Sequence, residues 1–448
     1  MSEAQEIALG RESDTQIRAE MGVYDDPDLQ RYIADIGMRL AKVSERPNLP
    51  WQFTVVDQPA INAFALPGGF IYITRGILPF LADEAELAGV LGHEVGHVTA
   101  RHSVRQYTRA LGGQLALGAL GAFVPAARPF GQATEQALGL MFLKYGRDDE
   151  RQSDQLGTRY EASVGWDPAG VPGMLATLGR LSEADGERKG VPNFLSTHPD
   201  PLSRVTEIRP TVDRLRGGRD DWRVNRDALL QRVDGIVFGD DPNQGITRGH
   251  VFLHPALRFA IDFPVGWQVA NGAQQVSARP SEGDMALVLQ VVEGQTGSLQ
   301  DVAQTTMANA GFRRVQGARS AINGLDAYVG TYDGQIEGLG QVTARAAHIA
   351  HAGKVYLVAG LCPPPAFDKA DPLFSTAIRS FRALSAADAE GIRPSRIDLY
   401  VVRGGDTWAA LAERSGGAVT PAALSIMNGA APTSSPEVGR RIKIVVAG

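Results

Sequence analysis

The pattern of apolar and polar positions changes several times along the chain, and each change predicts a different element. Near the start, apolar residues recur every three or four positions, as in a helix with one buried face. They are Leu29, Ile33, Ile36, Leu40 and Val43. Residues 51–56 alternate in polarity and residues 70–74 form a short apolar run, so both are expected to be strands. Helical patterns then continue to about residue 230, which predicts a mostly helical domain with a small sheet over residues 1–235.

The strongest helical pattern within this domain covers residues 83–104. Five apolar residues fall on one face of the expected helix, and they are Leu87, Val90, Leu91, Val95 and Val98. Asp83 precedes them and is expected to cap the helix, because its side chain can accept a hydrogen bond from a free backbone N–H. Glu84 and Glu86 follow in the first turn, where the helix dipole favours negative charge.

The middle of the chain changes to strand-like runs. A Gly-, Asp- and Pro-rich stretch at 236–249 is expected to be a linker. Strand-like runs follow at 259–263, 285–292 and 355–359, and helical runs at 299–309 and 366–381. These predict a separate α+β domain over residues 250–385, in which no catalytic constellation is visible. Its run FAIDFPVGWQV resembles domains of the Mog1/PsbP type.

The last part of the chain, after a second linker at 386–397, is expected to be a small βααβ module over residues 398–448. Strands are predicted at 399–402 and 441–445, and helices at 408–415 and 421–428. The order resembles a LysM module, although Trp408 stands where Leu is common. The whole chain is thus expected to be a multidomain α+β protein.

The LysM resemblance implies binding to a GlcNAc-containing glycan such as peptidoglycan or chitin. The glycan-binding residues that it implies are Gly405, Asp406, Thr407 and Asn428. The alternative is a packing domain of the same shape without affinity for glycan. Removing residues 398–448 is expected to abolish glycan binding and to leave peptide cleavage unchanged.

Composition narrows the class of protein. With 448 residues, 44% hydrophobic and 21% charged, the chain is expected to be globular and to hold two to four domains. A net charge of −6 argues against a nucleic-acid partner, which would favour a basic face. Cys362 is the single cysteine, which excludes an intramolecular disulfide and a cysteine-based zinc site.

The chain start, MSEAQEIALGRESD, lacks the basic and apolar regions of a signal peptide. We expect a periplasmic or cell-envelope protein whose signal peptide has been removed, with a cytoplasmic location as the alternative. The most apolar stretch, Ala110–Ala127, is rich in Gly and Ala and marginal as a membrane span. It is expected to pack as a helical hairpin, which leaves a peripheral membrane contact open.

The sequence HEVGH, residues 93–97, is the pattern that carries chemistry. On a helix, residues four apart lie about 40° apart around the axis and about 6 Å along it. His93 and His97 can therefore direct one ring nitrogen each at a single Zn²⁺ ion. Glu94 lies beside them, where it can take a proton from a water molecule that the metal activates. The alternative is a pair of solvated histidines on a helix surface.

Three runs of the sequence resemble the BepA-like and CAAX-prenyl-protease-related family of HExxH zinc gluzincin metallopeptidases. They are NAFALPGGFIYITRG, ELAGVLGHEVGHVTARHS and DERQSDQLG, and the resemblance covers residues 3–215. It implies that Glu150, from an ExxxD helix, is the third zinc ligand and that Asp154 orients a ligand histidine. Spacing alone places Glu150 and Asp154 on one helix face. The alternative to a metal ligand at Glu150 is a solvated charge on the helix surface. Ser153 stands where the family often has Ala.

The same resemblance assigns two further segments. Residues 62–65, which are Asn62, Ala63, Phe64 and Ala65, resemble the edge strand with which gluzincins bind extended substrate; the alternative is a plain turn. His198 and Arg204 match an HPxxxxR segment in an expected loop at 190–200. His198 is expected to occupy the open position of the zinc and keep the enzyme latent. The alternatives are that it stabilises the oxyanion or that its role is purely structural. Arg204 would hold this segment by an ion pair, and His102 is expected to be structural.

Together these features predict a zinc-dependent endopeptidase that hydrolyses unfolded or misassembled envelope proteins. Its partners would be polypeptide substrates and a GlcNAc glycan, and its cofactor one Zn²⁺. The alternative function is a peptidoglycan-associated chaperone or assembly factor with a latent protease domain.

Overall fold

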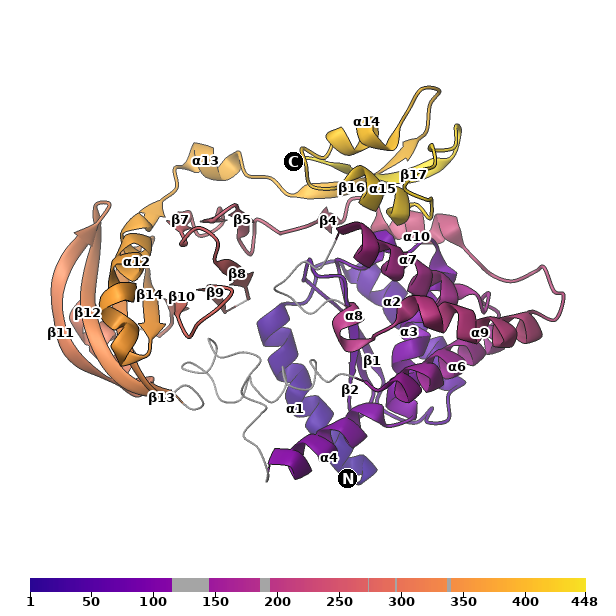
Figure 1. The fold of residues 1–448 in the computed structure, drawn as a ribbon, viewed down its shortest axis with the longest axis horizontal. Helices are drawn as coiled ribbons and strands as arrows, with labels where there is room; N and C mark the ends of the chain where they lie inside the picture. The colour runs from indigo at the N-terminus through magenta and orange to yellow at the C-terminus, as the bar shows by residue number, and fades with distance from the viewer. Residues whose placement is uncertain (115–144, 186–193, 273, 295, 337–339) are drawn as a thin grey trace. The chain divides into compact units, whose positions relative to one another are not determined.

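The computed structural model describes the chain except for residues 115–144, 186–193, 273, 295 and 337–339. These residues form two compact units (Figure 1), which confirms a multidomain α+β protein. The first unit combines the described parts of 1–113, 137–239 and 394–448. The apolar segment 110–127 lies, from residue 115 onward, outside the described residues. Each helix in the described part of the chain is too short or too polar to cross a membrane.

Helices make up most of the first unit. They are α1 (Glu3–Met21), α2 (Pro27–Lys42), α3 (Glu84–Thr99), α4 (His102–Gln114), α6 (Arg147–Ser163), α7 (Gly170–Asp185), α8 (Phe194–Thr197), α9 (Pro201–Arg216) and α10 (Arg226–Val233). The predicted apolar stripe on α2 is buried as expected, except for Val43. The helix ends at Lys42, and Val43 is 42% exposed. Asp26 begins α2 by accepting hydrogen bonds from the N–H groups of Asp28 and Leu29.

A small sheet lies against these helices. Its strands are β1 (Gln52–Val56), β2 (Ala63–Leu66) and β3 (Phe70–Thr74), arranged in the order β1-β3-β2. β1 runs parallel to β3 and β2 runs antiparallel to it. β2 therefore lies at an edge, and no described strand pairs with its other side. Helix α3 contacts both β2 and β3 as well as α2, α6, α7 and α10, so it runs through the centre of the unit.

Helix α3 is shorter than the pattern over 83–104 predicts. Asp83 caps its start by accepting a hydrogen bond from the N–H of Glu86 at 3.0 Å, as expected. Its end comes at Thr99, because Arg101 has a φ of 59° and a left-handed backbone cannot continue a right-handed helix. The chain turns there and α4 begins at His102. The turn directs the start of α4 back towards the end of α3.

The C-terminal residues belong to the first unit rather than forming a separate one. The strands β16 (Ser395–Val401) and β17 (Arg441–Val446) pair antiparallel and flank α14 (Trp408–Glu413) and α15 (Pro421–Met427), in the βααβ order that the sequence predicts. β16 also pairs with β4 (Val237–Phe238) (Figure 1). The apolar side chains of the module and those of α3 form one continuous core. Deleting residues 398–448 would expose part of that core, so the glycan site is better tested by point substitutions in the full chain.

A long antiparallel sheet dominates the second unit, with the order β11-β12-β13-β14-β10-β9-β8. Its strands are β8 (Gln268–Asn271), β9 (Gln275–Arg279), β10 (Ala286–Val292), β11 (Phe312–Ile322), β12 (Leu325–Ile336), β13 (Gly340–His351) and β14 (Lys354–Cys362). Helices α11 (Leu299–Asn309) and α12 (Phe367–Ser380) pack on this sheet. Both helices lie where the periodicity predicts them, whereas β11, β12 and β13 were not predicted.

Smaller elements complete the second unit. A second sheet has the order β15-β7-β6-β5. Its strands are β5 (Ile246–Arg248), β6 (Val251–His254), β7 (Phe259–Asp262) and β15 (Arg382–Ala383), and the short helix α13 (Ala386–Glu390) follows it. Two 3₁₀ turns, η1 (Leu78–Phe80) in the first unit and η4 (Pro364–Ala366) in the second, complete the elements of the described residues.

Candidate metal centre

The two histidines and the glutamate of the HEVGH run lie deep inside the first unit. His93, Glu94 and His97 are all 0% exposed on α3. A pair of solvated surface histidines is therefore excluded. Helix α3 is buried along nearly its whole length because other helices and the small sheet surround it, so side chains from several elements can reach these residues.

Small residues let α6 approach α3 at the level of these histidines. A Cβ atom added to Gly157 would lie 2.9 Å from the backbone nitrogen of His93, and one added to Gly96 would lie 3.1 Å from the Cα of Ser153. Both contacts are tighter than ordinary packing allows, so the crossing requires glycine at these positions. A small side chain at 153 suits the same crossing. The close approach carries Glu150 and Asp154 to the two histidines.

Four side chains converge at this crossing, from α3, α6 and the segment after α8. Ligand atoms of His93, His97, Glu150 and His198 all lie within 4.8 Å of one another, and each side chain is buried. The two Nε2 atoms of His93 and His97 are 2.9 Å apart. The Nδ1 atom of His198 lies 2.9 Å from Oε1 of Glu150 and 3.2 Å from Nε2 of His93.

Asp154 and Arg204 fix the orientation of His93. Oδ1 of Asp154 is 3.0 Å from Nδ1 of His93, and a carboxylate can only accept, so Nδ1 carries the proton and Nε2 keeps a lone pair. Arg204 donates to both oxygens of Asp154, at 2.8 and 2.7 Å, and lies 2.5 Å from Oε2 of Glu150. The guanidinium thus ties the two acidic residues together. The partner of Arg204, which sequence reasoning left unnamed, is this pair of carboxylates.

The donor set fits a metal cation. Burial lowers the pKa of His97 well below its usual value, so its ring is neutral. Burial opposes ionisation of Glu150, but His198, His97 and His93 outweigh it and hold the pKa of that carboxyl well below its usual range. The neutral ring of His97 and the carboxylate of Glu150 therefore face a common point, together with Nε2 of His93. Such a set suits a single Zn²⁺ ion, with His93, His97 and Glu150 able to hold it.

Glu94 lies next to this cluster but makes no hydrogen bond to it. Neither of its carboxylate oxygens has a hydrogen-bond partner among the described residues, and Oε1 is 3.6 Å from Nε2 of His198. Burial raises the pKa of Glu94 above its usual value. A buried carboxylate without a partner and with a raised pKa is suited to taking up a proton.

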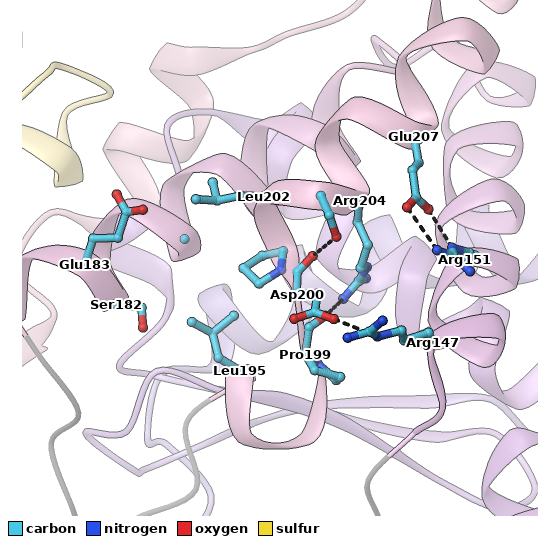
Figure 2. A pocket seen from close by; sticks show the side chains of 13 residues that line it. Arg147, Arg151, Ser182, Glu183, Leu195, Pro199, Asp200, Leu202, Arg204 and Glu207 are labelled. Atoms are coloured by element: carbon cyan, nitrogen blue, oxygen red, sulfur yellow. Dashed lines mark hydrogen bonds and ion pairs between the residues drawn. The ribbon is translucent and has the colours of Figure 1, made fainter.

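The segment that carries His198 lies along a cavity of about 510 Å³. The expected loop at 190–200 is in part the short helix α8, and residues 186–193 lie outside the described part. Figure 2 shows Arg147 directed at Asp200, with Nε 2.8 Å from Oδ2, and Leu195 and Pro199 facing the same cavity. Asp200 has a φ of 56° at the start of α9. The segment borders open space, and an exposed ion pair holds its outer end. Backbone hydrogen bonds from Phe194 to Ile61 and from Tyr145 to Thr197 hold its inner part.

Comparison with known proteins identifies the domain that contains this cluster. Residues 27–212 match the Peptidase family M48. The chain carries a family M48 peptidase domain. Over 226 residues it is 30% identical to the Beta-barrel assembly-enhancing protease of Escherichia coli, covering 48% of this chain and 45% of that protein. The chain thus spans about half the length of such curated relatives.

Other relatives share the M48 domain. The mitochondrial metalloendopeptidase OMA1 of Arabidopsis thaliana is 34% identical over 202 residues, covering 44% of this chain and 40% of that protein. Metalloprotease YcaL of Escherichia coli is 29% identical over 190 residues, covering 41% and 71%. A solution structure of cyanobacterial PsbP from Synechocystis aligns with 31% of this chain at 17% identity, with a TM-score of 0.26 that is too low to assign a fold.

The predicted substrate strand of the M48 domain is the edge strand β2. The carbonyl of Ile61 accepts from the N–H of Phe194 at 2.9 Å, and that of Ala65 from Oγ of Ser103 at 3.3 Å, so both point away from β3. Because strand residues alternate, Ala63 has the same orientation. Its N–H and C=O therefore face the free edge, and Oδ1 of Asn62 is buried without a described partner.

The residues that the LysM resemblance names fall into two groups. Gly405 and Thr407 are exposed in the turn before α14, although Thr407 also caps α14 by accepting from the N–H of Ala410. Asp406 accepts from the N–H of Arg403 in the same turn. Asn428 is only 3% exposed, and its amide bonds to the backbone of Leu424 and Lys443. The amide of Asn428 is thus engaged inside the module rather than on its surface.

Sequence reasoning missed Tyr145 beside the cluster. Its ring centroid is 3.8 Å from that of His97, and its hydroxyl lies 2.9 Å from Oγ of Ser103. Burial raises the pKa of Tyr145 far above its usual range, so the phenol stays protonated. Tyr145 stands outside every motif, and only its contacts in the fold identify it.

Proposed function

We propose that the chain is a zinc-dependent endopeptidase that cleaves unfolded or misassembled proteins of the cell envelope. The observation that supports this most directly is the meeting of His93, His97 and Glu150 beside an unpartnered Glu94, inside a family M48 domain. The names of the relatives, a Beta-barrel assembly-enhancing protease and mitochondrial metalloendopeptidases, suggest polypeptide substrates and a location in the envelope.

In the proposed mechanism His93, His97 and Glu150 hold the ion. A bound zinc ion supplies Lewis acidity, which polarises the scissile carbonyl and makes water more acidic. Glu94 takes the proton from the attacking water. It then delivers that proton to the amide nitrogen as the C–N bond breaks, so the same carboxylate serves first as base and then as acid. Its raised pKa favours the second of these steps.

We propose that the substrate binds as an extended strand along β2. Ala63 offers one N–H and one C=O to a peptide backbone, and the unpartnered amide oxygen of Asn62 can accept a further N–H. The side chain of Phe64 lies on the face of the sheet opposite to that of Ala63, where it stacks on Tyr72. Recognition through backbone groups favours chains that are unfolded, because a folded protein has already paired these groups.

We propose that His198 holds this centre latent. Its Nδ1 contacts Glu150 at 2.9 Å within the ligand cluster, so it can take the position that a substrate or water would need. The cavity beside the segment gives it room to withdraw, and the exposed ion pair between Arg147 and Asp200 is a weak tether. Oxyanion support is the alternative role of His198.

The substitution Glu94→Gln tests the peptidase function. It keeps the size of the side chain and removes its basicity, so zinc content should stay at one per chain while cleavage of a disordered protein such as casein falls at least about 100-fold. Zinc is measured by atomic absorption and cleavage by gel. His93→Gln is the control, and it should lose both. Full activity in Glu94→Gln would refute the mechanism, whereas no cleavage by zinc-loaded wild type would favour the chaperone function.

We also propose that the C-terminal residues form a LysM-type module that binds a GlcNAc glycan such as peptidoglycan. The βααβ order and the exposed turn at Gly405 and Thr407 support this. Gly404→Arg, which fills that turn in the full chain, should abolish sedimentation with peptidoglycan. Ala418→Arg, on the exposed α14–α15 connection, is the matched control. Equal sedimentation of both variants and wild type would identify a packing module.

A further inference from the structure

His102 lies at the point where the chain turns back from α3. The left-handed backbone of Arg101 ends the helix and places His102 at the start of α4, with 0% of the residue exposed. Nδ1 of His102 lies 2.9 Å from Nδ1 of His97. Nδ1 of His97, the ring nitrogen that points away from the ligand cluster, thus faces a second histidine instead of a carboxylate or a carbonyl.

The partners on the other side of His102 determine which nitrogen carries its proton. Nε2 lies 3.0 Å from Oε1 of Gln152 and 3.4 Å from Oδ1 of Asp149. Both oxygens accept, and the carboxylate cannot donate, so Nε2 of His102 carries the proton. Nδ1 of His102 is then an acceptor with one lone pair. Oγ of Ser153 lies farther from this lone pair, at 3.3 Å.

The state of His97 follows from that of His102. Its Nδ1 faces an acceptor and must donate, so its Nε2 is left with a lone pair. That lone pair points towards Nε2 of His93 and Oε1 of Glu150, which lie 2.9 and 3.4 Å away. The opposite assignment would put a proton on Nε2 of His97 and prevent it from binding a metal.

We propose that His102 is a positioning residue for the metal centre, which acts through His97. Its Nδ1 accepts a hydrogen bond from the Nδ1–H group of His97. This contact selects the tautomer of His97 that can bind zinc and fixes the plane of its ring. Asp154 performs the same task for His93, so each ligand histidine has its own acceptor. The inference rests on the proposed zinc site and adds a residue outside the HExxH and ExxxD motifs.

Two substitutions of His102 distinguish selection of the His97 tautomer from a role in packing alone. His102→Asn places an amide oxygen near the position of Nδ1 and keeps the acceptor. His102→Leu has a similar volume but offers no acceptor, and leaves the Nδ1 proton of His97 buried and unpaired. If His102 only packs, the two variants should have similar zinc affinities. If it selects the tautomer of His97, their zinc affinities should differ.

Zinc affinity measured by competition with a chelator at fixed pH is the decisive readout. His102→Leu should bind zinc about 10- to 100-fold more weakly than wild type, the usual loss when a partner of a metal ligand is removed. His102→Asn should recover most of that loss. His348→Leu, which removes a buried histidine of the second unit, is the control and should leave zinc affinity unchanged.

Two results would overturn the inference. One is wild-type zinc affinity in His102→Leu, and the other is equal loss in the Asn and Leu variants while thermal unfolding of both metal-free proteins stays normal. Failure of the proposed function looks different, because wild-type protein would then bind zinc without cleaving casein. The variants would still report on His102 in that case, since affinity is measured without turnover.

Discussion

His198 joins the ligand cluster through one ring nitrogen and approaches Glu94 with the other. If it keeps the enzyme latent, His198→Ala frees the centre, and basal cleavage of casein should rise several-fold at unchanged zinc content. If it stabilises the oxyanion instead, the same variant should lose about 100-fold or more. Initial rates with matched zinc analysis separate the two roles. Reduced cleavage in a folded, zinc-loaded variant would exclude latency as the main role.

At the scale of single residues, the sequence predicts the roles of some residues in the metal centre much better than those of others. His93, Glu94 and His97 follow from spacing on one helix, because helix geometry is fixed locally. Glu150 and Asp154 required the resemblance, since spacing left solvated charges as an alternative, and the helix crossing now places both inside the protein. The partner role of His102 was missed, because it depends on a backbone break at Arg101 that periodicity does not reveal.

The crossing of α3 and α6 is the contact between elements on which the centre depends. Gly157→Ala adds a methyl group that would lie 2.9 Å from the backbone of Gly92 and His93, and backbone atoms cannot move aside as a side chain can. We expect a loss of roughly 1–3 kcal/mol in the free energy of unfolding, together with weaker zinc binding because Glu150 moves away.

The matched control for this crossing is Gly146→Ala, at the start of α6. There the added methyl group meets only an oxygen of Asp149, at 3.8 Å. Denaturant unfolding and chelator competition should show little change in this variant. A Gly157→Ala protein as stable as wild type, with normal zinc affinity, would mean that the helices can separate without cost to the site.

Helices and strands were predicted to different degrees. The positions of α2, α11 and α12 follow closely from apolar periodicity, and Asp83 was correctly predicted to begin α3. The strand β11 was not predicted, because its residues between Phe312 and Ile322 are all exposed and carry no alternation. An exposed strand is defined by its pairing with β12, which a single sequence does not display.

At the scale of the whole molecule, Lys443 joins the C-terminal module to the start of α3. Its Nζ donates to the carbonyl of Leu81 at 2.6 Å, and burial lowers its pKa from 10.5 to about 7. Between these values the unfolded chain binds a proton that the folded chain does not, so stability should rise with pH. The gain is complete above pH 10.5 and is lost as the pH falls towards about 7.

Lys443→Met removes this titration and keeps the shape of the side chain. Wild type minus variant should therefore show a slope in the free energy of unfolding, of at most about 1.4 kcal/mol per pH unit. Burial also raises the pKa of the neighbouring Glu86 to about 7, which affects mainly the range below pH 7. Denaturant unfolding of both proteins from about pH 7 to 9.5 measures the slope. Parallel curves would show that Lys443 of the folded chain stays protonated over this range, as a solvated lysine does.

The near-complete burial of α3 has a consequence for the proposed protease, which would meet other copies of itself. Proteolysis acts on segments that open, and a helix enclosed on all sides opens only when the whole unit unfolds. Its backbone amides should therefore exchange with deuterium more slowly than those of exposed helices such as α9. The residues that perform the chemistry would then be the last part of the chain to become a substrate for another copy.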